Sequence, residues 1–181
     1  MIMLETNRLM LRFYKETDLE AYHAIMSDEE NMYYLYDIVS RTVEESRISL
    51  ENAIKVNTKE KARRFAVTLK GDETFIGACG YEIAGHTPLG KIADPMGWFI
   101  HREYQNKGYM TEAVKRVLQF AFHEDNCVRV ATGCFKSNLP TQKVMEKVGF
   151  RQEADKPEAM WLDGKMQDRL EFAINRGEYV S

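Results

Sequence analysis

A short turn between a strand-like segment and a strongly amphipathic helix constrains this chain more than any other feature. The turn spans residues 105–110 (QNKGYM). One face of the following helix is apolar, with a 3.6-residue stripe at Val114, Val117, Leu118, Ala121 and Phe122. A glycine-containing turn at a helix N-terminus collects unpaired N–H groups and the positive end of the helix dipole. The segment therefore indicates a site for an anion such as a phosphate or diphosphate.

The turn differs from the two common phosphate-binding loops. The chain has neither GxxxxGK[ST], which defines a P-loop, nor the GxGxxG of a dinucleotide-binding fold. A nucleotide-dependent phosphotransferase is therefore disfavoured. Because one glycine is common in strand-turn-helix junctions, the spacing alone also leaves an ordinary structural turn open.

The rest of the chain alternates between strand and helix patterns. Strands are expected at residues 8–13, 64–69, 74–83, 92–101, 128–135, 150–153 and 168–174, and helices near 17–26, 42–57, 111–122 and 138–147. Thr42 to Glu45 form a capping box, Gly149 ends the last helix, and residues 85–90 are expected to form a loop. Pro95 makes the first part of its strand irregular. The order β-α-α-β-β-β-α-β-α-β-β predicts a single α/β domain over residues 1–181 with a mixed sheet.

Composition excludes several classes of protein. The 181 residues include 25 Lys and Arg against 28 Asp and Glu, which gives a net charge of −3. The chain therefore lacks the excess of basic residues with which a protein binds nucleic acid, and no nucleic-acid partner is expected. No apolar run approaches the about 20 residues of a membrane span, and residues 1–12 lack the apolar core of a signal peptide. We therefore expect a cytoplasmic protein with no membrane partner.

The three cysteines are an odd number at wide spacing. Cys79, Cys127 and Cys134 form no CxxC pair or Cys/His cluster, so neither a disulfide framework nor a zinc site is indicated, and no metal is expected. Cys79 and Cys134 stand in apolar, strand-like stretches and are interpreted as small core residues.

Four further segments surround the turn in a fixed order. They are residues 5–12 (ETNRLMLR), 97–101 (GWFIH), 138–150 (NLPTQKVMEKVGF) and a late hairpin at 163–168 (DGKMQD), and Glu112-Ala113 follows the turn itself. Together they resemble the motifs of the GNAT superfamily of acyl-CoA-dependent N-acetyltransferases. The first segment and residues 138–150 resemble its ribosomal-protein N-terminal acetyltransferase branch. The resemblance covers nearly the whole chain and implies a GNAT-like mixed, splayed central β-sheet flanked by helices.

Two positions depart from the family pattern in the turn. Asn106 replaces the common second glycine, and Met110 replaces a small final residue. Asn tolerates left-handed backbone angles, so the turn can be kept. Met110 can still offer its backbone N–H if its side chain points away from the phosphates.

The resemblance implies acetyl-CoA as co-substrate. Pantetheine would lie along the splayed sheet like an added strand, a form of β-augmentation that uses main-chain groups of Phe99, Ile100 and His101. Asn138 would hold the far side of the pantetheine arm. The N–H groups implied for the diphosphate are those of Lys107, Gly108, Tyr109, Met110 and Thr111.

The implied reaction is direct attack of a neutral primary amine on the thioester in a ternary complex. Glu82 is the first candidate for the general base, with a merely solvated carboxylate or His101 as alternatives. Many family members carry a Tyr acid where this chain has Met145, so we interpret Thr141 as the proton donor to the thiolate. A helix-capping role for Thr141 is equally open.

Residues of two separate segments are implied to form the cleft for the acceptor amine. The implied cleft is walled by Tyr33, Tyr34, Tyr36, Asp37 and Trp161, although aromatic clusters are more often core. The acceptor could be a protein N-terminus or a small amine, and an acidic cleft at Asp37 and Glu82 would favour a cation. A non-catalytic acyl-CoA-binding module is the alternative function, and homodimer formation stays open.

Overall fold

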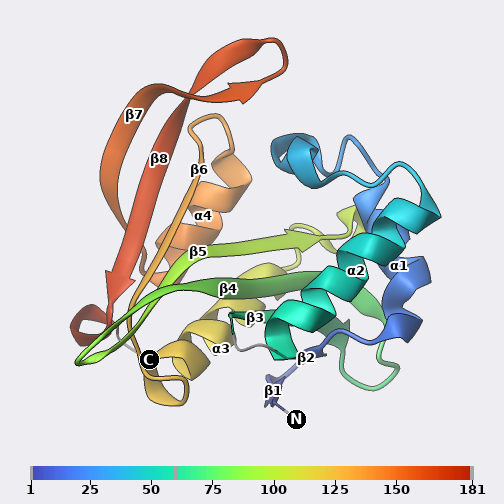
Figure 1. The fold of residues 1–181 in the computed structure, drawn as a ribbon, viewed down its shortest axis with the longest axis horizontal. Helices are drawn as coiled ribbons and strands as arrows, with labels where there is room; N and C mark the ends of the chain where they lie inside the picture. The colour runs from blue at the N-terminus through green and yellow to red at the C-terminus, as the bar shows by residue number, and fades with distance from the viewer. Residues whose placement is uncertain (1, 59–60, 180–181) are drawn as a thin grey trace. The chain divides into compact units, whose positions relative to one another are not determined.

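The computed structural model describes residues 2–58 and 61–179 as a mixed α/β fold (Figure 1). Within these residues, eight strands form one mixed sheet in the order β1-β2-β3-β4-β5-β6-β8-β7. The strands are β1 Met3–Glu5, β2 Leu9–Phe13, β3 Ala62–Leu69, β4 Phe75–Thr87, β5 Gly90–Ile100, β6 Cys127–Phe135, β7 Arg151–Leu162 and β8 Lys165–Asn175. The helices are α1 Leu19–Met26, α2 Val43–Thr58, α3 Tyr109–His123 and α4 Leu139–Val148, with 3-10 helices η1 Glu16–Asp18, η2 Tyr33–Ile38, η3 Arg102–Tyr104 and η4 Arg176–Glu178.

The predicted class and element order are confirmed, with one short strand added. The extra strand, β1, pairs antiparallel with β2. The predicted loop at residues 85–90 is wrong, because β4 continues to Thr87 and β5 begins at Gly90. The Thr87 hydroxyl accepts hydrogen bonds from the N–H groups of Leu89 and Gly90, which closes a much tighter turn.

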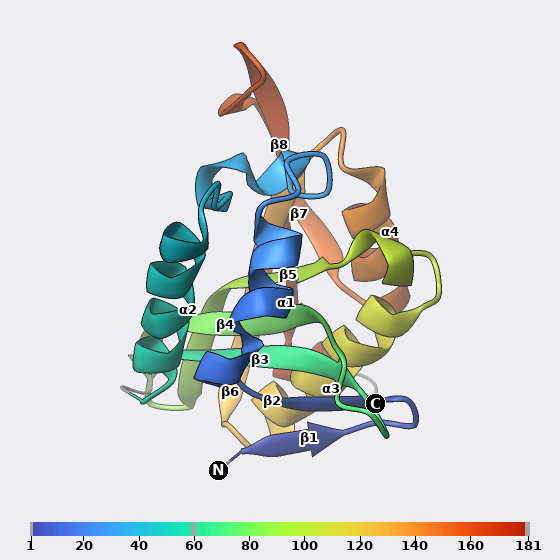
Figure 2. The ribbon, with the colours of Figure 1, turned by 90° about the vertical axis from the view of Figure 1, so that its right-hand side faces the viewer.

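The chain divides into two compact units, and the first comprises Met1–Glu82 and Gly97–Val117. Strands β1 to β4 pair antiparallel in it, with Leu11 opposite Val67 and Phe65 opposite Cys79. Helices α1 and α2 lie side by side against these strands (Figure 2). The side chains of their shared core are Tyr14, Tyr22, Ile25, Met26, Met32, Leu50, Ala53, Ala66, Phe75 and Ala78. The capping box at the start of α2 is confirmed, since Thr42 Oγ1 accepts from the Glu45 N–H and Glu45 accepts from the Thr42 N–H.

The second unit comprises Ile83–Met96 and Leu118–Ser181. Strand β8 lies between β6 and β7 and pairs antiparallel with both. The parallel pairing of β5 with β6 in this unit ends at Ala93 opposite Val130. Beyond it stands Pro95, which has no N–H to donate, and the Thr132 hydroxyl instead donates to the Met96 carbonyl at 2.6 Å. The expected irregularity at Pro95 is therefore confirmed.

Strand β7 is far longer than the four residues expected at 150–153. It extends over Arg151–Leu162 with almost all of its side chains exposed. Because neither face is apolar, no alternation marks it in the sequence, and cross-strand ion pairs such as Lys156 with Glu171 accompany the ladder instead.

The cysteines behave as core residues. Cys79, Cys127 and Cys134 are all free and buried. Burial raises the pKa of the Cys134 thiol to about 11, so it stays protonated at neutral pH. Among the described residues, no helix is long and apolar enough to cross a membrane.

A buried ion pair fixes the connection between β2 and α1. The Arg12 guanidinium donates to both carboxylate oxygens of Asp18, at 2.7 and 2.8 Å, and Asp18 also accepts from the Lys15 N–H. The two paired side chains are only 8 and 5% exposed. Breaking such a pair leaves an uncompensated buried charge.

We expect Arg12→Met to lower the free energy of unfolding by about 3–5 kcal/mol. Breaking the exposed Lys15–Glu73 pair with Lys15→Met should cost less than about 1 kcal/mol and serves as the control. Urea unfolding measures both. A loss in Arg12→Met no larger than in the control would contradict the role of the buried pair.

Candidate active site

The turn before α3 has the backbone conformation that its sequence allows. Asn106 and Gly108 both have left-handed φ angles, of 58° and 79°. The prediction that Asn106 keeps the turn is therefore confirmed. Helix α3 then begins at Tyr109, and the N–H groups of its first turn have no acceptor within the helix. Met110 is 6% exposed, so its side chain packs inward and its backbone stays beside the turn.

A carboxylate from α3 holds the turn against the N-terminal segment. Glu112 accepts from the Thr6 hydroxyl at 2.6 Å and from the Arg8 N–H at 3.0 Å. The Arg8 guanidinium binds the second oxygen of Glu112, at 2.7 Å from Nε and 2.6 Å from Nη2. Arg8 also donates to the Lys107 carbonyl at 3.0 Å. We call Thr6, Arg8 and Glu112 the clamp.

The electrostatics of the clamp favour an ionised carboxylate. Desolvation raises the pKa of Glu112, but the hydrogen bonds from Thr6 and Arg8 outweigh it and leave the pKa below its ordinary value. The Arg8 guanidinium also lies 4.4 Å from the centroid of the Tyr109 ring. Lys107 Nζ lies 5.5 Å from the centroid of the Tyr104 ring. Two cations therefore accompany the helix N-terminus, and one of them is neutralised by Glu112.

The last residues of β5 have two main-chain edges. One edge faces β4, and the other points away from β4. The His101 N–H donates to the Ile76 carbonyl of β4 at 2.8 Å. Because successive residues of a strand point their N–H groups to opposite edges, the Ile100 N–H points away from β4. The Ile100 carbonyl accepts from the Asn31 side chain at 3.1 Å. Of the main-chain groups predicted for a cofactor, the His101 N–H and the Ile100 carbonyl thus already have partners within the protein.

The side chains of this strand end pack as ordinary core. The Phe99 ring lies 6.1 Å from that of Tyr22 in an edge-on arrangement and packs against the core cluster. The His101 ring nitrogen Nδ1 accepts from the Glu103 N–H and caps η3. The sequence allowed both core packing and backbone recognition here, and core packing is what the side chains show.

Glu82 stands on β4 as an ion-paired carboxylate. It lies opposite Ala62 of β3 and pairs with the guanidinium of Arg64, while both side chains stay partly exposed. Nothing in the sequence indicates Arg64 as the partner of Glu82. A base at Glu82 would therefore act beside a fixed positive charge.

In the second unit, the predicted residues of α4 belong to its first turns. Asn138 is the N-cap, and its Oδ1 accepts from the Thr141 N–H at 3.2 Å. The capping role that the sequence left open at Thr141 thus belongs to Asn138. Met145 is fully buried, so the position for which the family resemblance implies a Tyr acid contributes to packing here.

The predicted acceptor-side residues have mostly exposed side chains. Tyr33 is 43% exposed and lies edge-on to Tyr34 on η2, and Asp37 of the same segment is exposed. The side chain of Tyr36 lies outside the part that the structure describes. Trp161, in the second unit, is 55% exposed opposite Met166. Exposed aromatic side chains of this kind are available to a ligand.

Comparison with known proteins identifies the family. The model of the acetyltransferase (GNAT) domain matches residues 8–151. The chain belongs to the GNAT acetyltransferase family. It is therefore an acetyl-CoA-dependent acetyltransferase, and its mixed eight-stranded sheet with flanking helices matches solved structures of the family.

Relatives match along the whole length of the chain. The uncharacterized N-acetyltransferase YnaD of Bacillus subtilis (strain 168) is 28% identical over 176 residues, 97% of this chain and 98% of the relative. A GNAT-family acetyltransferase of Bacillus anthracis is 27% identical with a TM-score of 0.83, covering 98% of this chain and 100% of that one. A ribosomal L7/L12 α-N-protein acetyltransferase in complex with coenzyme A shares the fold, with 17% sequence identity and a TM-score of 0.84. The match covers 96% of this chain and 98% of that one.

The sequence predicts the residues of the clamp only in part. Thr6 and Arg8 lie in the segment that resembles the family's opening motif, but nothing there indicates that they hold Glu112 from 106 and 104 residues away. The sequence marks Glu112 only as the residue that follows the turn with Ala113. Asn31 carried no sequence signal at all.

We expect Glu112→Gln to weaken coenzyme A binding about tenfold, or about 1.4 kcal/mol. Gln keeps the shape of the side chain but removes the charge that holds Arg8. Isothermal titration calorimetry measures the Kd, and Glu51→Gln, which removes an exposed carboxylate paired with Lys55 on α2, is the matched control. An unchanged Kd in Glu112→Gln would show that the clamp does not shape the binding turn.

The same carboxylate should make folding depend on pH. Its folded-state pKa is lowered, so its stabilising contribution is present above the unfolded value of about 4.3 and is lost as pH falls through the folded pKa. Below about pH 4.3, urea unfolding of the wild-type protein should therefore lose stability more steeply than that of Glu112→Gln. Parallel profiles of the two proteins would contradict this assignment.

Proposed function

We propose that this protein transfers the acetyl group of acetyl-CoA to a primary amine, on a protein N-terminus or a small molecule, by direct attack in a ternary complex. The observation that carries the proposal is the clamped turn at residues 105–111, where two left-handed residues lead into the N-terminus of α3. Such a turn directs several N–H groups at one point, as a diphosphate requires.

The diphosphate would bind the N–H groups of Lys107, Gly108, Tyr109, Met110 and Thr111. The buried side chain of Met110 supports this, because only its backbone then faces the ligand. Pantetheine would lie along the edge of β5 that points away from β4. That edge carries the Ile100 N–H, which narrows the predicted main-chain contacts of Phe99, Ile100 and His101 to the middle residue.

The amine must lose a proton before it attacks. An α-amino group has a pKa of about 8 and an alkyl amine of about 10, so both are mostly protonated at neutral pH. We propose that Glu82 attracts the ammonium group and accepts its proton, directly or through water. The ion pair with Arg64 holds the Glu82 side chain in one orientation, which supports a role in attracting and positioning the ammonium group.

For the second unit, we propose Asn138 as a contact of the pantetheine arm and Thr141 as a group that acts on the thioester. The Oδ1 of Asn138 is engaged in the cap of α4, so its amide nitrogen is the group left to meet the pantetheine arm. The same cap holds Thr141 in the first turn of the helix. We propose that the Thr141 hydroxyl donates a hydrogen bond to the leaving thiolate, a role that the thioether of Met145 cannot take.

The acceptor would be recognised by Tyr33, Tyr36, Asp37 and Trp161. The side chains of Tyr33, Trp161 and Asp37 are exposed, and aromatic rings with a carboxylate suit a cationic amine. The solved relative named for L7/L12 supports testing protein N-termini beside small amines.

The test is release of free coenzyme A thiol from acetyl-CoA across a panel of amines. The panel holds peptides with free N-terminal Ser or Ala, a polyamine and an aminoglycoside. At least one amine should be turned over, and Glu82→Gln should then lower kcat about 100-fold. Glu153→Gln, which removes another ion-paired strand carboxylate, should stay within about twofold of the wild type.

Two results would count against the proposal. Thermal stabilisation by coenzyme A without thiol release from any amine would favour a non-catalytic acyl-CoA-binding module. Equal rates in Glu82→Gln and Glu153→Gln would remove Glu82 as the base.

A further inference from the structure

We propose that Asn31 is a positioning residue that ties the acceptor-side segment after α1 to the cofactor-binding turn, so that cofactor binding orders the acceptor site. The inference rests on the proposed function, because it assigns the turn to acetyl-CoA and η2 to the acceptor. It concerns residues within the first compact unit alone.

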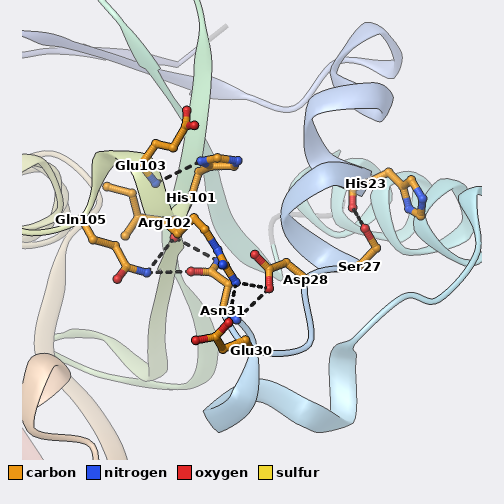
Figure 3. A network of polar contacts seen from close by, with 10 residues as sticks. His23, Ser27, Asp28, Glu30, Asn31, His101, Arg102, Glu103 and Gln105 are labelled. Atoms are coloured by element: carbon orange, nitrogen blue, oxygen red, sulfur yellow. Dashed lines mark hydrogen bonds and ion pairs between the residues drawn. The ribbon is translucent and has the colours of Figure 1, made fainter.

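One side-chain amide joins the two segments (Figure 3). Asn31 Nδ2 donates to the Ile100 carbonyl at 3.1 Å, and Asn31 Oδ1 accepts from Gln105 Nε2 at 2.6 Å. Gln105 Nε2 also lies 3.5 Å from the Ile100 carbonyl. A primary amide is the side chain that donates at one end and accepts at the other, so Asn31 meets both partners at once.

A second tie holds the same segment. The Arg102 guanidinium donates to Asp28 at 2.6 Å and to Glu30 at 3.2 Å, and Asp28 also accepts from the Asn31 N–H at 3.1 Å. These ion pairs are largely exposed, and exposed pairs contribute little by themselves. The half-buried amide of Asn31 is therefore the specific contact, and Asp28 orients its backbone.

The two partners of Asn31 belong to the proposed cofactor site. Gln105 immediately precedes Asn106, the first left-handed residue of the turn. Ile100 is the last residue of β5, and its N–H lies on the edge assigned to pantetheine. A cofactor bound to the turn and to the Ile100 N–H would therefore also hold Gln105 and the Ile100 carbonyl in place, and these are the two hydrogen-bonding partners of Asn31.

The chain that follows Asn31 transmits its position to the acceptor side. Met32 is fully buried in the core cluster, and its carbonyl accepts from the Leu35 N–H at 2.7 Å. The 3-10 helix η2 begins at Tyr33, directly after Met32, and includes Asp37. Asn31 thus stands one residue before the anchor of η2, so losing its contacts would free the start of that segment.

This arrangement predicts coupling between two binding events. If cofactor binding at the turn favours the ordered state of residues 28–38, acceptor binding must favour the cofactor by the same factor. Asn31 would act through Gln105 and Ile100 and would not touch the reacting atoms.

Hydrogen exchange read by mass spectrometry tests the coupling with coenzyme A as the probe. In the wild-type protein, saturating coenzyme A should slow exchange at least threefold both in residues 105–112 and in residues 28–38. In Asn31→Leu, and in the isosteric Asn31→Asp, protection of 105–112 should remain and that of 28–38 should be lost. Asn175→Leu removes a comparable bridging amide, between Arg129 and Glu178, and should behave as the wild type.

A kinetic split supplies the second readout. With the best amine of the panel and saturating acetyl-CoA, Asn31→Asp should raise the acceptor KM about tenfold and change kcat less than about threefold. Equal losses in kcat and in coenzyme A affinity would mark a merely structural role.

The possible failures are distinguishable. If coenzyme A protects neither segment, the proposed function fails. If it protects 105–112 but leaves 28–38 unchanged in the wild-type protein, the cofactor assignment stands and the role of Asn31 is overturned.

Discussion

The carboxylate of Glu112 is the contact on which the candidate site depends. It joins the N-terminal segment to the first turn of α3, using a hydroxyl, a backbone N–H and a guanidinium as donors. Arg8 extends the connection to the Lys107 carbonyl within the turn itself. An anion-binding turn works only if its N–H groups already point at one place before the ligand arrives. The clamp supplies that fixed geometry at the cost of placing a negative charge beside the site, and Arg8 balances that charge.

The end of β5 adds the second element, a main-chain edge with a defined direction. The hydrogen bond from His101 to Ile76 settles which N–H groups point toward β4 and which point away. Within the second unit, pairing of β5 with β6 ends at Ala93, and a Thr132 hydroxyl takes the Met96 carbonyl. Both features follow from elementary constraints, namely the alternation of a strand and the missing N–H of Pro95.

The sequence predicted the elements well where one face is apolar or a special residue marks a boundary. The stripe on α3, the capping box at Thr42 and the turn at Asn106 and Gly108 were all found in this way. Strand β7 was mostly missed, because its exposed, charged faces carry no apolar period. The prediction of a loop at residues 85–90 was wrong, because the Thr87 hydroxyl closes a tight turn there and local propensity does not reveal such a contact.

The candidate site was predictable only in its local part. The turn lies in one stretch of sequence, so its residues could be named from motif and spacing. Arg64 beside Glu82 and Asn31 beside Gln105 are contacts across 18 and 74 positions, set by strand register and by loop packing. Such contacts leave no periodic trace in a single sequence.

The proposed function depends first on binding of a diphosphate by the backbone N–H groups of residues 107–111. Titrations followed by amide NMR test it most directly, with coenzyme A compared with pantetheine, which lacks the diphosphate. Coenzyme A should strongly shift the amide resonances of Gly108, Tyr109, Met110 and Thr111, while pantetheine should leave them nearly unchanged. Equal shifts with both compounds, or none with coenzyme A, would contradict it.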